Sequence, residues 1–272
     1  MTETAALPSA PELVRREVAD GVLRLTLANP QRRNALSEAM MSALLASIEA
    51  AGADSDVRVV VIAAEGPAFS AGHDLKELSQ HRAAPDNGRA YYDRIFTLCA
   101  RLMTAVVRLP KPVIAEVKGV ATAAGCQLAA SCDLVVAGDN AKFATPGVNI
   151  GLFCSTPMVA LSRAVGAKQA MEMLLLGEPI DAPTALAFGL VNRVVAEADL
   201  TGEVNRLAAR IVAKSPLVLK IGKEAFYAQR EMGLDEAYHY TARVMTENML
   251  ARDAAEGIDA FLTKRSPEWQ GR

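Results

Sequence analysis

Residues 119–133 read GVATAAGCQLAASCD, a run of small side chains between two apolar segments. The segments on either side, 111–120 and 132–138, are short and apolar, which is typical of buried strands. Residues 122–126 form a small-residue turn that leads from the first strand into a helix. Strand, turn and helix recur in this order over about residues 19–195, and this alternation predicts an α/β fold.

A second small-residue turn follows another apolar segment. Residues 70–74 read SAGHD and come after the predicted strand at 57–66. The first amides of a helix have no partner within the helix, and the aligned peptide dipoles favour negative charge there. Small side chains let a ligand approach those amides closely. Two such turns that meet would form an oxyanion hole, although spacing alone leaves open that both are simply tight packing turns.

The remaining helices have recognisable ends. Ser37 is predicted to cap a helix whose apolar residues between 40 and 48 recur at helical spacing. A long helix is predicted over about 91–109, where prolines end the pattern. Glycine favours the residue just past a helix C-terminus, so Gly177 and Gly189 are predicted to end two further helices.

The last part of the chain is almost wholly helical. Apolar residues recur at helical spacing over roughly 199–214, 216–231, 235–250 and 252–263. We therefore expect three parts: an N-terminal extension at 1–18, an α/β core at 19–195 and a helical lobe at 196–272.

Composition excludes several classes of protein. The 29 basic and 31 acidic side chains nearly cancel, so no strong field favours a nucleic acid or an anionic membrane. No segment approaches the ~18 uninterrupted apolar residues that a membrane span needs, and the opening MTETAALPSAPELVRR lacks the pattern of a secretory signal. The four cysteines show no CxxC or other metal-ligand spacing and are expected to be reduced thiols. We expect a cytoplasmic protein without a metal, a nucleic-acid partner or a membrane partner.

Five segments, taken in order, resemble the signature segments of the crotonase (enoyl-CoA hydratase/isomerase) superfamily. They are NPQRRNALS (29–37), AFSAGHDLKEL (68–78), GVATAAGCQLAASCDL (119–134), AKFATPGVNIGL (141–152) and EGIDAFLTKRSPEW (256–269). The resemblance implies a ClpP/crotonase-like spiral of ββα units with a helical C-terminal trimerisation lobe, assembled as a homotrimer or a dimer of trimers. It also implies an acyl-CoA thioester as the ligand, with coenzyme A entering as part of the substrate and no separate cofactor.

The resemblance assigns roles by position. The backbone amides of His73 and Ala124 would be the two oxyanion donors. Residues near the thioester or along the coenzyme A path would be Arg33, Ala35, Ala71, Asp74, Leu75, Gly125 and Pro146. Phe261 and Lys264 lie three residues apart on a predicted helix and share a face. In the family this region often reaches coenzyme A phosphates across a subunit boundary; a solvated basic C-terminus is the alternative.

Two positions depart from the hydratase pattern. A typical hydratase holds two glutamates over the enoyl group, because paired carboxylates can give and take protons. Here the first position is Gln127 and the second is Gly147. An amide does not titrate, and glycine has no side chain. Loss of one positioned acid or base costs about 10²–10⁴-fold, so little hydration is expected by that mechanism.

Three functions follow from this pattern. The first is an acyl-CoA enzyme of the hydratase/isomerase type with an altered acid/base pair. The second is a decarboxylase or another enolate-forming lyase acting on a malonyl-type acyl-CoA, which needs the oxyanion hole but no strong base. The third is a non-catalytic CoA-ester binder or regulatory subunit. His73 could act as an acid or base, whereas no base adjacent in the sequence supports Cys154 as a nucleophile.

Overall fold

The computed structural model describes residues 12–272, so residues 1–11 of the predicted extension lie outside the described residues. Strand β1 (Val14–Ala19) pairs with β2 (Val22–Leu27) in antiparallel fashion. The sheet therefore begins inside the segment that we assigned to an extension. Only Val14 of β1 is buried, so this strand shows no apolar alternation from which it could have been recognised.

The large sheet has the strand order β1-β2-β3-β5-β7-β10 and is parallel from β2 to β10. Its further strands are β3 (Val59–Ala64), β5 (Val113–Val117), β7 (Leu134–Gly138) and β10 (Arg193–Val195). Every residue of β3 and β5 is buried, because helices cover both faces of the sheet. This explains why these strands are continuous apolar runs in the sequence.

A second, smaller sheet has the order β4-β6-β8-β9. Its strands are β4 (Ala68–Ser70), β6 (Val120–Thr122), β8 (Lys142–Ala144) and β9 (Ile180–Asp181). Three successive units place their first strand in the large sheet and their second in the small sheet: β3 with β4, β5 with β6 and β7 with β8. Strands β4, β6 and β8 are parallel, so their carboxyl ends meet at one edge.

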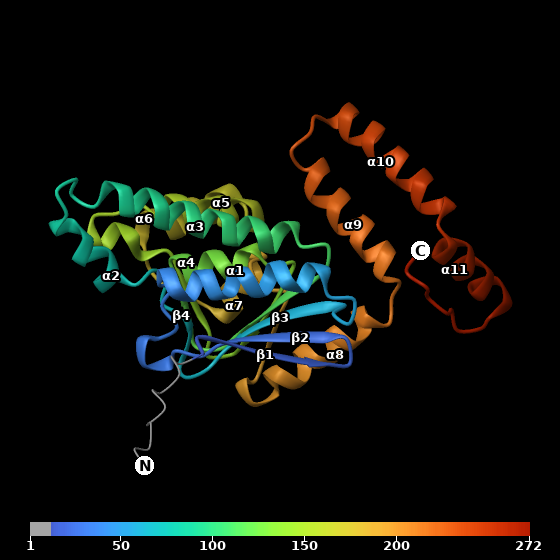
Figure 1. The fold of residues 1–272 in the computed structure, drawn as a ribbon, viewed down its shortest axis with the longest axis horizontal. Coiled ribbons are helices and arrows are strands. Elements are labelled where there is room, and N and C mark those ends of the chain that lie inside the picture. The colour runs from blue at the N-terminus through green and yellow to red at the C-terminus, as the bar shows by residue number, and fades with distance from the viewer. Residues whose placement is uncertain (1–11) are drawn as a thin grey trace, which may run out of the picture.

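Helices fill the space on one side of the sheets (Figure 1). They are α1 (Glu38–Ala53), α2 (Leu75–Gln80), α3 (Arg89–Arg108), α4 (Ala124–Ser131), α5 (Ser155–Ala164), α6 (Ala167–Leu176) and α7 (Ala182–Phe188). Short 3₁₀ turns are η1 (Pro30–Arg32), η2 (His81–Ala83), η3 (Pro146–Ile150) and η4 (Glu197–Asp199). Ser37 caps α1 by accepting a hydrogen bond from the Met40 amide at 3.2 Å, as predicted. Gly177 and Gly189 end α6 and α7 with positive φ, also as predicted.

The last four helices divide into two groups. Helix α8 (Leu200–Val212) packs its apolar face on β3, β5 and β7, so it belongs to the core although the predicted boundary placed it in the lobe. Helices α9 (Pro216–Gln229), α10 (Leu234–Leu250) and α11 (Arg252–Thr263) project away from the sheets (Figure 1). Many of their apolar side chains are exposed, among them Leu234, Tyr238, Leu250 and Phe261.

Within residues 12–272, no helix combines the length and the apolar character that crossing a bilayer requires.

Candidate functional site

Three turns meet at one edge of the small sheet. The turn after β4 carries His73, the turn after β6 leads into α4 at Ala124, and the turn after β8 carries Pro146 and Gly147. Because β4, β6 and β8 are parallel neighbours, their carboxyl ends lie side by side. The sheet topology therefore gathers segments that lie far apart in the sequence.

The first two turns are in direct contact at a glycine. Gly72 has φ +82°, and a Cβ at this position would lie 2.9 Å from the Ala123 Cβ and 3.2 Å from the Ala124 nitrogen. Gly125 is equally close to the neighbouring turn, where an added Cβ would lie 2.8 Å from the Ser70 Cβ. No side chain fits at either glycine, so small residues are needed for these turns to approach each other.

Residues 29–37 fix the turn at 71–74 and the residues just before it through hydrogen bonds. The Asn34 side chain is fully buried and donates hydrogen bonds of 2.8 Å to the carbonyls of Glu65 and Ala68. The Ala71 amide donates to the Arg33 carbonyl at 3.0 Å, and the Leu36 amide donates to the Gly72 carbonyl at 2.8 Å. The segment that includes Arg33 and Ala35 is thereby fixed next to the turn at 71–74.

The two amides that the resemblance assigned as oxyanion donors have no acceptor. Neither the His73 nor the Ala124 amide donates a hydrogen bond to any group within residues 12–272. Helix α4 starts without a side-chain cap, and its first residue follows Ala123, which has φ 49° and ψ −118°. A non-glycine residue in this region costs about 1–3 kcal/mol and persists only where its surroundings enforce it. Unpaired amides at the start of a helix favour an anionic ligand.

The His73 imidazole is largely buried beside its own turn. Its Nδ1 lies 3.3 Å from the Leu36 carbonyl oxygen, and its Nε2 is buried without a hydrogen-bond partner within the described residues. The ring meets the edge of Phe96 at a centroid distance of 5.4 Å. Burial lowers the pKa of His73, with the Leu36 hydrogen bond as a smaller opposing effect. The side chain is therefore neutral at pH 7.

Asp74 holds the start of α2 and the preceding turn together through its carboxylate. Its carboxylate caps α2 by accepting hydrogen bonds from the amides of Lys76 and Glu77 at 3.0 and 3.3 Å. Arg32 completes the arrangement with an ion pair at 3.0 Å. The neighbouring Leu75 side chain is exposed. Asp74 is thus engaged by protein groups and its carboxylate is not left available as a base.

Gln127 is buried in α4 and its amide is oriented by a thiol. Cys99 on α3 donates its S–H to the Gln127 Oε1 at 3.7 Å. Burial raises the pKa of Cys99 to about 12, so the thiol keeps its proton at neutral pH and acts as a donor. The Gln127 Nε2 donates no hydrogen bond within the described residues. With Oε1 already accepting, Gln127 offers N–H donors to a ligand, as does the turn before it.

The space beside Gly147 is already filled. A Cβ at this position would lie 2.7 Å from the Leu152 carbonyl oxygen and 2.9 Å from the Cys154 Sγ. Cys154 is itself buried, and burial raises the pKa of its thiol. A glutamate could therefore not be introduced at position 147 without moving the backbone at Leu152. The position that the resemblance assigned to the second glutamate of a hydratase therefore has no room for a glutamate side chain.

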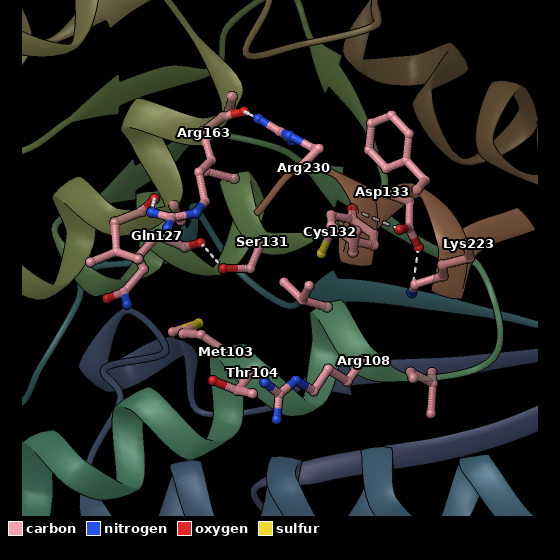
Figure 2. A pocket seen from close by; sticks show the side chains of 18 of the residues that line it. Met103, Thr104, Arg108, Gln127, Ser131, Cys132, Asp133, Arg163, Lys223 and Arg230 are labelled. Atoms are coloured by element: carbon pink, nitrogen blue, oxygen red, sulfur yellow. Dashed lines mark hydrogen bonds and ion pairs between the residues drawn. The ribbon is translucent and has the colours of Figure 1, made fainter. Parts of the chain in front are cut away.

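A cavity of about 880 Å³ opens next to Gln127, between α3, α4, α5 and α9 (Figure 2). Ligand pockets usually measure ~300–1,000 Å³. Met103, Val159 and Leu190 give it apolar walls. The charged residues that line it are Arg108, Asp133, Arg163, Lys223, Glu224, Arg230 and Glu231.

A buried ion pair fastens α9 as one wall of this cavity. Lys223 donates to the Asp133 carboxylate at 2.7 Å and to the carbonyls of Lys111 and Val106 at 2.9 and 3.2 Å. Tyr227 donates to the same carboxylate at 2.9 Å. All three protons of the ammonium group are thus used, so Lys223 is a structural anchor. Burial lowers the pKa of Lys223, and the Asp133 charge opposes this shift.

The structure does not bring all the predicted residues together. Phe261 and Lys264 are exposed on and just after α11, in the projecting lobe. Within residues 12–272, no three histidine, cysteine, aspartate or glutamate side chains form a group able to hold a metal ion. Sequence reasoning missed Cys99, Arg108, Arg163, Lys223 and Arg230. Cys99 carried no signal because it lies in the apolar stripe of α3, and the others depend on how α9 docks.

The comparisons with known proteins identify the family. Residues 17–272 match the family described as Enoyl-CoA hydratase/isomerase. The chain belongs to this family, and the predicted crotonase fold is confirmed by its solved structural neighbours.

Individual relatives agree with this assignment. The chain is 51% identical over 249 residues to the Xenopus laevis protein named enoyl-CoA hydratase domain-containing protein 3, mitochondrial, covering 92% of this chain and 83% of the relative. It is similar to the crystal structure of an enoyl-CoA hydratase from Mycobacterium smegmatis, with a TM-score of 0.90 and 51% identity over 94% of this chain and 98% of that one. The crystal structure of human enoyl-CoA hydratase domain-containing protein 3 also has a TM-score of 0.90, at 49% identity over 94% of this chain and 100% of that one.

One expectation from the sequence is wrong. We expected a cytoplasmic protein, but relatives about half identical to this chain from Xenopus laevis, human and rat are all named as mitochondrial. Unpaired cysteines and balanced charge suit any reducing, aqueous compartment. These features therefore could not separate the cytoplasm from the mitochondrion.

Proposed function

We propose that this protein binds an acyl-CoA thioester and polarises the thioester carbonyl with the backbone amides of His73 and Ala124. The observation that carries the proposal is the contact between their two turns at Gly72, combined with the absence of any acceptor for either amide within residues 12–272. Removal of one such donor typically costs about 3–4 kcal/mol of transition-state stabilisation. Coenzyme A would lie along Arg33, Ala35, Ala71, Leu75 and the turn at 145–147.

The local chemistry argues against ordinary hydration. Gln127 does not titrate, and the space beside Gly147 is occupied by the Cys154 thiol and the Leu152 carbonyl. Asp74 is held by α2 and Arg32, and His73 is buried and neutral. A reaction of this site must therefore rely mainly on electrostatic stabilisation of a thioester enolate.

Decarboxylation of a malonyl-type acyl-CoA is the second candidate, and the orientation of Gln127 favours it. Loss of carbon dioxide leaves electrons on the α-carbon, and the oxyanion donors would hold the resulting enolate. No strong base is needed to start the reaction. Because Cys99 occupies the Gln127 Oε1, the Nε2 protons remain available and would add a donor near the developing charge. A silent CoA-ester binder or regulatory subunit is the outcome if no product forms.

The projecting lobe supports a homotrimer or a dimer of trimers. Phe261 and Lys264 lie at the far end of α11, and Phe261 is 83% exposed. Helices α10 and α11 expose several large apolar side chains, which is unusual for a monomeric surface. We propose that this lobe packs on a second copy, where Lys264 would approach the coenzyme A phosphates of the neighbouring site.

The test measures binding and turnover separately. Crotonyl-CoA and methylmalonyl-CoA would each be titrated into the protein by calorimetry, and hydration and carbon dioxide release would then be followed. We expect binding of both thioesters, little hydration and measurable carbon dioxide release. Rapid hydration of crotonyl-CoA would contradict our account of Gln127 and Gly147. Binding without any product would identify a CoA-ester binder, and absence of binding would refute the thioester site itself.

A further inference from the structure

The cavity next to Gln127 contains a group of arginines that the oxyanion turns do not explain. Arg108, Arg163 and Arg230, here called the cavity arginines, come from α3, α5 and the end of α9. Figure 2 shows Arg108 on the wall formed by α3, across the cavity from Arg163 and Arg230. We propose that this cavity receives the acyl chain of a CoA thioester whose far end is a carboxylate. The inference rests on the function proposed above and names its substrate class.

The cavity is placed to receive an acyl chain. It reaches Gln127, which lies about one helical turn beyond the amide of Ala124. From there it follows α4 past Ser131, between the apolar side chains of Met103 and Leu190. A thioester carbonyl at the start of α4 would direct its carbon chain along these apolar walls. The chain would then end near the cavity arginines.

Two of the cavity arginines are fixed and one is free. Arg230 donates to the Arg163 carbonyl at 2.6 Å, and its guanidinium lies 5.6 Å from the ring centroid of Phe226. Arg163 is tied to the Val159 carbonyl at 3.2 Å and to Glu231 at 3.3 Å. Arg108 forms neither a hydrogen bond nor an ion pair within residues 12–272. Two oriented guanidinium groups across the cavity from an unpaired one form an arrangement that a carboxylate would complete.

The charge balance of the cavity also favours an anion. The ion pair of Lys223 and Asp133 cancels, which leaves the three cavity arginines opposed by Glu224 and Glu231. Glu231 and Arg163 are both more than half exposed, so their ion pair is weak. A cation near the C-terminus of a helix is favourable by itself. That effect accounts for each arginine alone, but it does not explain why three helix ends converge on one cavity.

Arginine suits this role because its planar guanidinium can form two parallel hydrogen bonds to one carboxylate. The test compares two thioesters of equal chain length, adipoyl-CoA and hexanoyl-CoA, by calorimetric titration of the full chain. Adipoyl-CoA should bind about tenfold more tightly or better, since hydrogen bonds between charged groups exceed neutral ones. Raised salt should weaken this preference.

Three variants locate the effect. Arg108→Gln and Arg230→Gln should each reduce the preference for adipoyl-CoA several-fold, with little change for hexanoyl-CoA. Arg101→Gln is the matched control, because Arg101 lies on the same helix as Arg108 but outside the cavity, paired only weakly with Glu49 at 3.8 Å. Circular dichroism would verify folding, and Arg108 makes no hydrogen bond or ion pair within residues 12–272 that the substitution would break.

The outcomes separate this inference from the function on which it rests. Equal affinity for the two thioesters, or a preference unchanged in both arginine variants, would overturn the carboxylate inference and leave the thioester site standing. Binding of neither thioester would refute the thioester site as well. A preference that is lost in Arg108→Gln and Arg230→Gln but kept in Arg101→Gln would establish the substrate class.

Discussion

Gly72 is the position at which the turns that carry the two proposed oxyanion donors touch, and Gly72→Ala tests whether that contact sets the geometry of the site. Alanine at φ +82° costs about 1–2 kcal/mol because its Cβ approaches the following carbonyl. The added Cβ would also lie 2.9 Å from both the Ala123 Cβ and the Thr122 oxygen, and such overpacking costs a further ~1–3 kcal/mol. We therefore expect a loss of about 2–5 kcal/mol in the free energy of unfolding.

The same substitution should weaken carbonyl polarisation, because relief of the clash separates the amides of His73 and Ala124. A conjugated thioester such as cinnamoyl-CoA absorbs at longer wavelength when its carbonyl is polarised, so the size of this red shift is the readout. Gly151→Ala is the matched control, since Gly151 has φ +76° and no atom within 4 Å of an added Cβ. It should lose only ~1–2 kcal/mol and keep the red shift. Equal losses of stability and an unchanged red shift in both variants would refute our account of the turn contact.

Three further predictions concern the surroundings of the site. Gly147→Ala should destabilise the fold by about 1–3 kcal/mol, because a thiol and a carbonyl already fill the space. Gly222→Ala, in open space on α9, should leave the denaturant midpoint unchanged or raise it. A larger loss of stability in Gly222→Ala than in Gly147→Ala would contradict this account. Lys223→Met should cost about 3 kcal/mol in the free energy of unfolding by removing the only cation paired with the Asp133 carboxylate within residues 12–272, whereas exposed Lys220→Met should change little. Burial lowers the pKa of His73 below its ordinary value of 6.5, so the unfolded chain binds more protons and stability should fall as the pH drops below about 6.5. His73→Gln should flatten this dependence in urea titrations from pH 7.5 to 5, and an unchanged slope would show that another group is responsible.

The parts of the fold that could be predicted from sequence share long, regular patterns. The helices near 216–231 and 252–263 were predicted to within about two residues of α9 and α11, since their apolar spacing and end residues agree. Strand β1 was missed because almost all of it is exposed, and its pairing depends on backbone bonds that leave no pattern in the side chains. The strands of the small sheet contain only two or three residues each, which is too short for any periodicity to be recognised.

Some features of the candidate site could likewise be predicted from the sequence, and others could not. The small residues of 70–74 and 122–126 indicated two turns that can approach each other closely, because close approach of two backbones requires glycine and alanine. The cavity was not predictable, because it exists only where Lys223 on α9 pairs with Asp133, 90 residues away in the sequence. The sequence alone showed that position 147 is a glycine. Only the folded structure showed that Cys154 fills the space where a side chain at this position would lie.

The four cysteines are all free and buried, and they occupy α3, α4, the end of α4 and the start of α5. Because none is accessible in the folded state, a thiol reagent can modify them only after the surrounding layer opens. The protein therefore contains its own reporters of local opening around the site, with no label to introduce. The order in which Cys99, Cys126, Cys132 and Cys154 react would rank the rigidity of each wall of the site, and slower reaction in the presence of a thioester would identify the walls that the ligand holds closed.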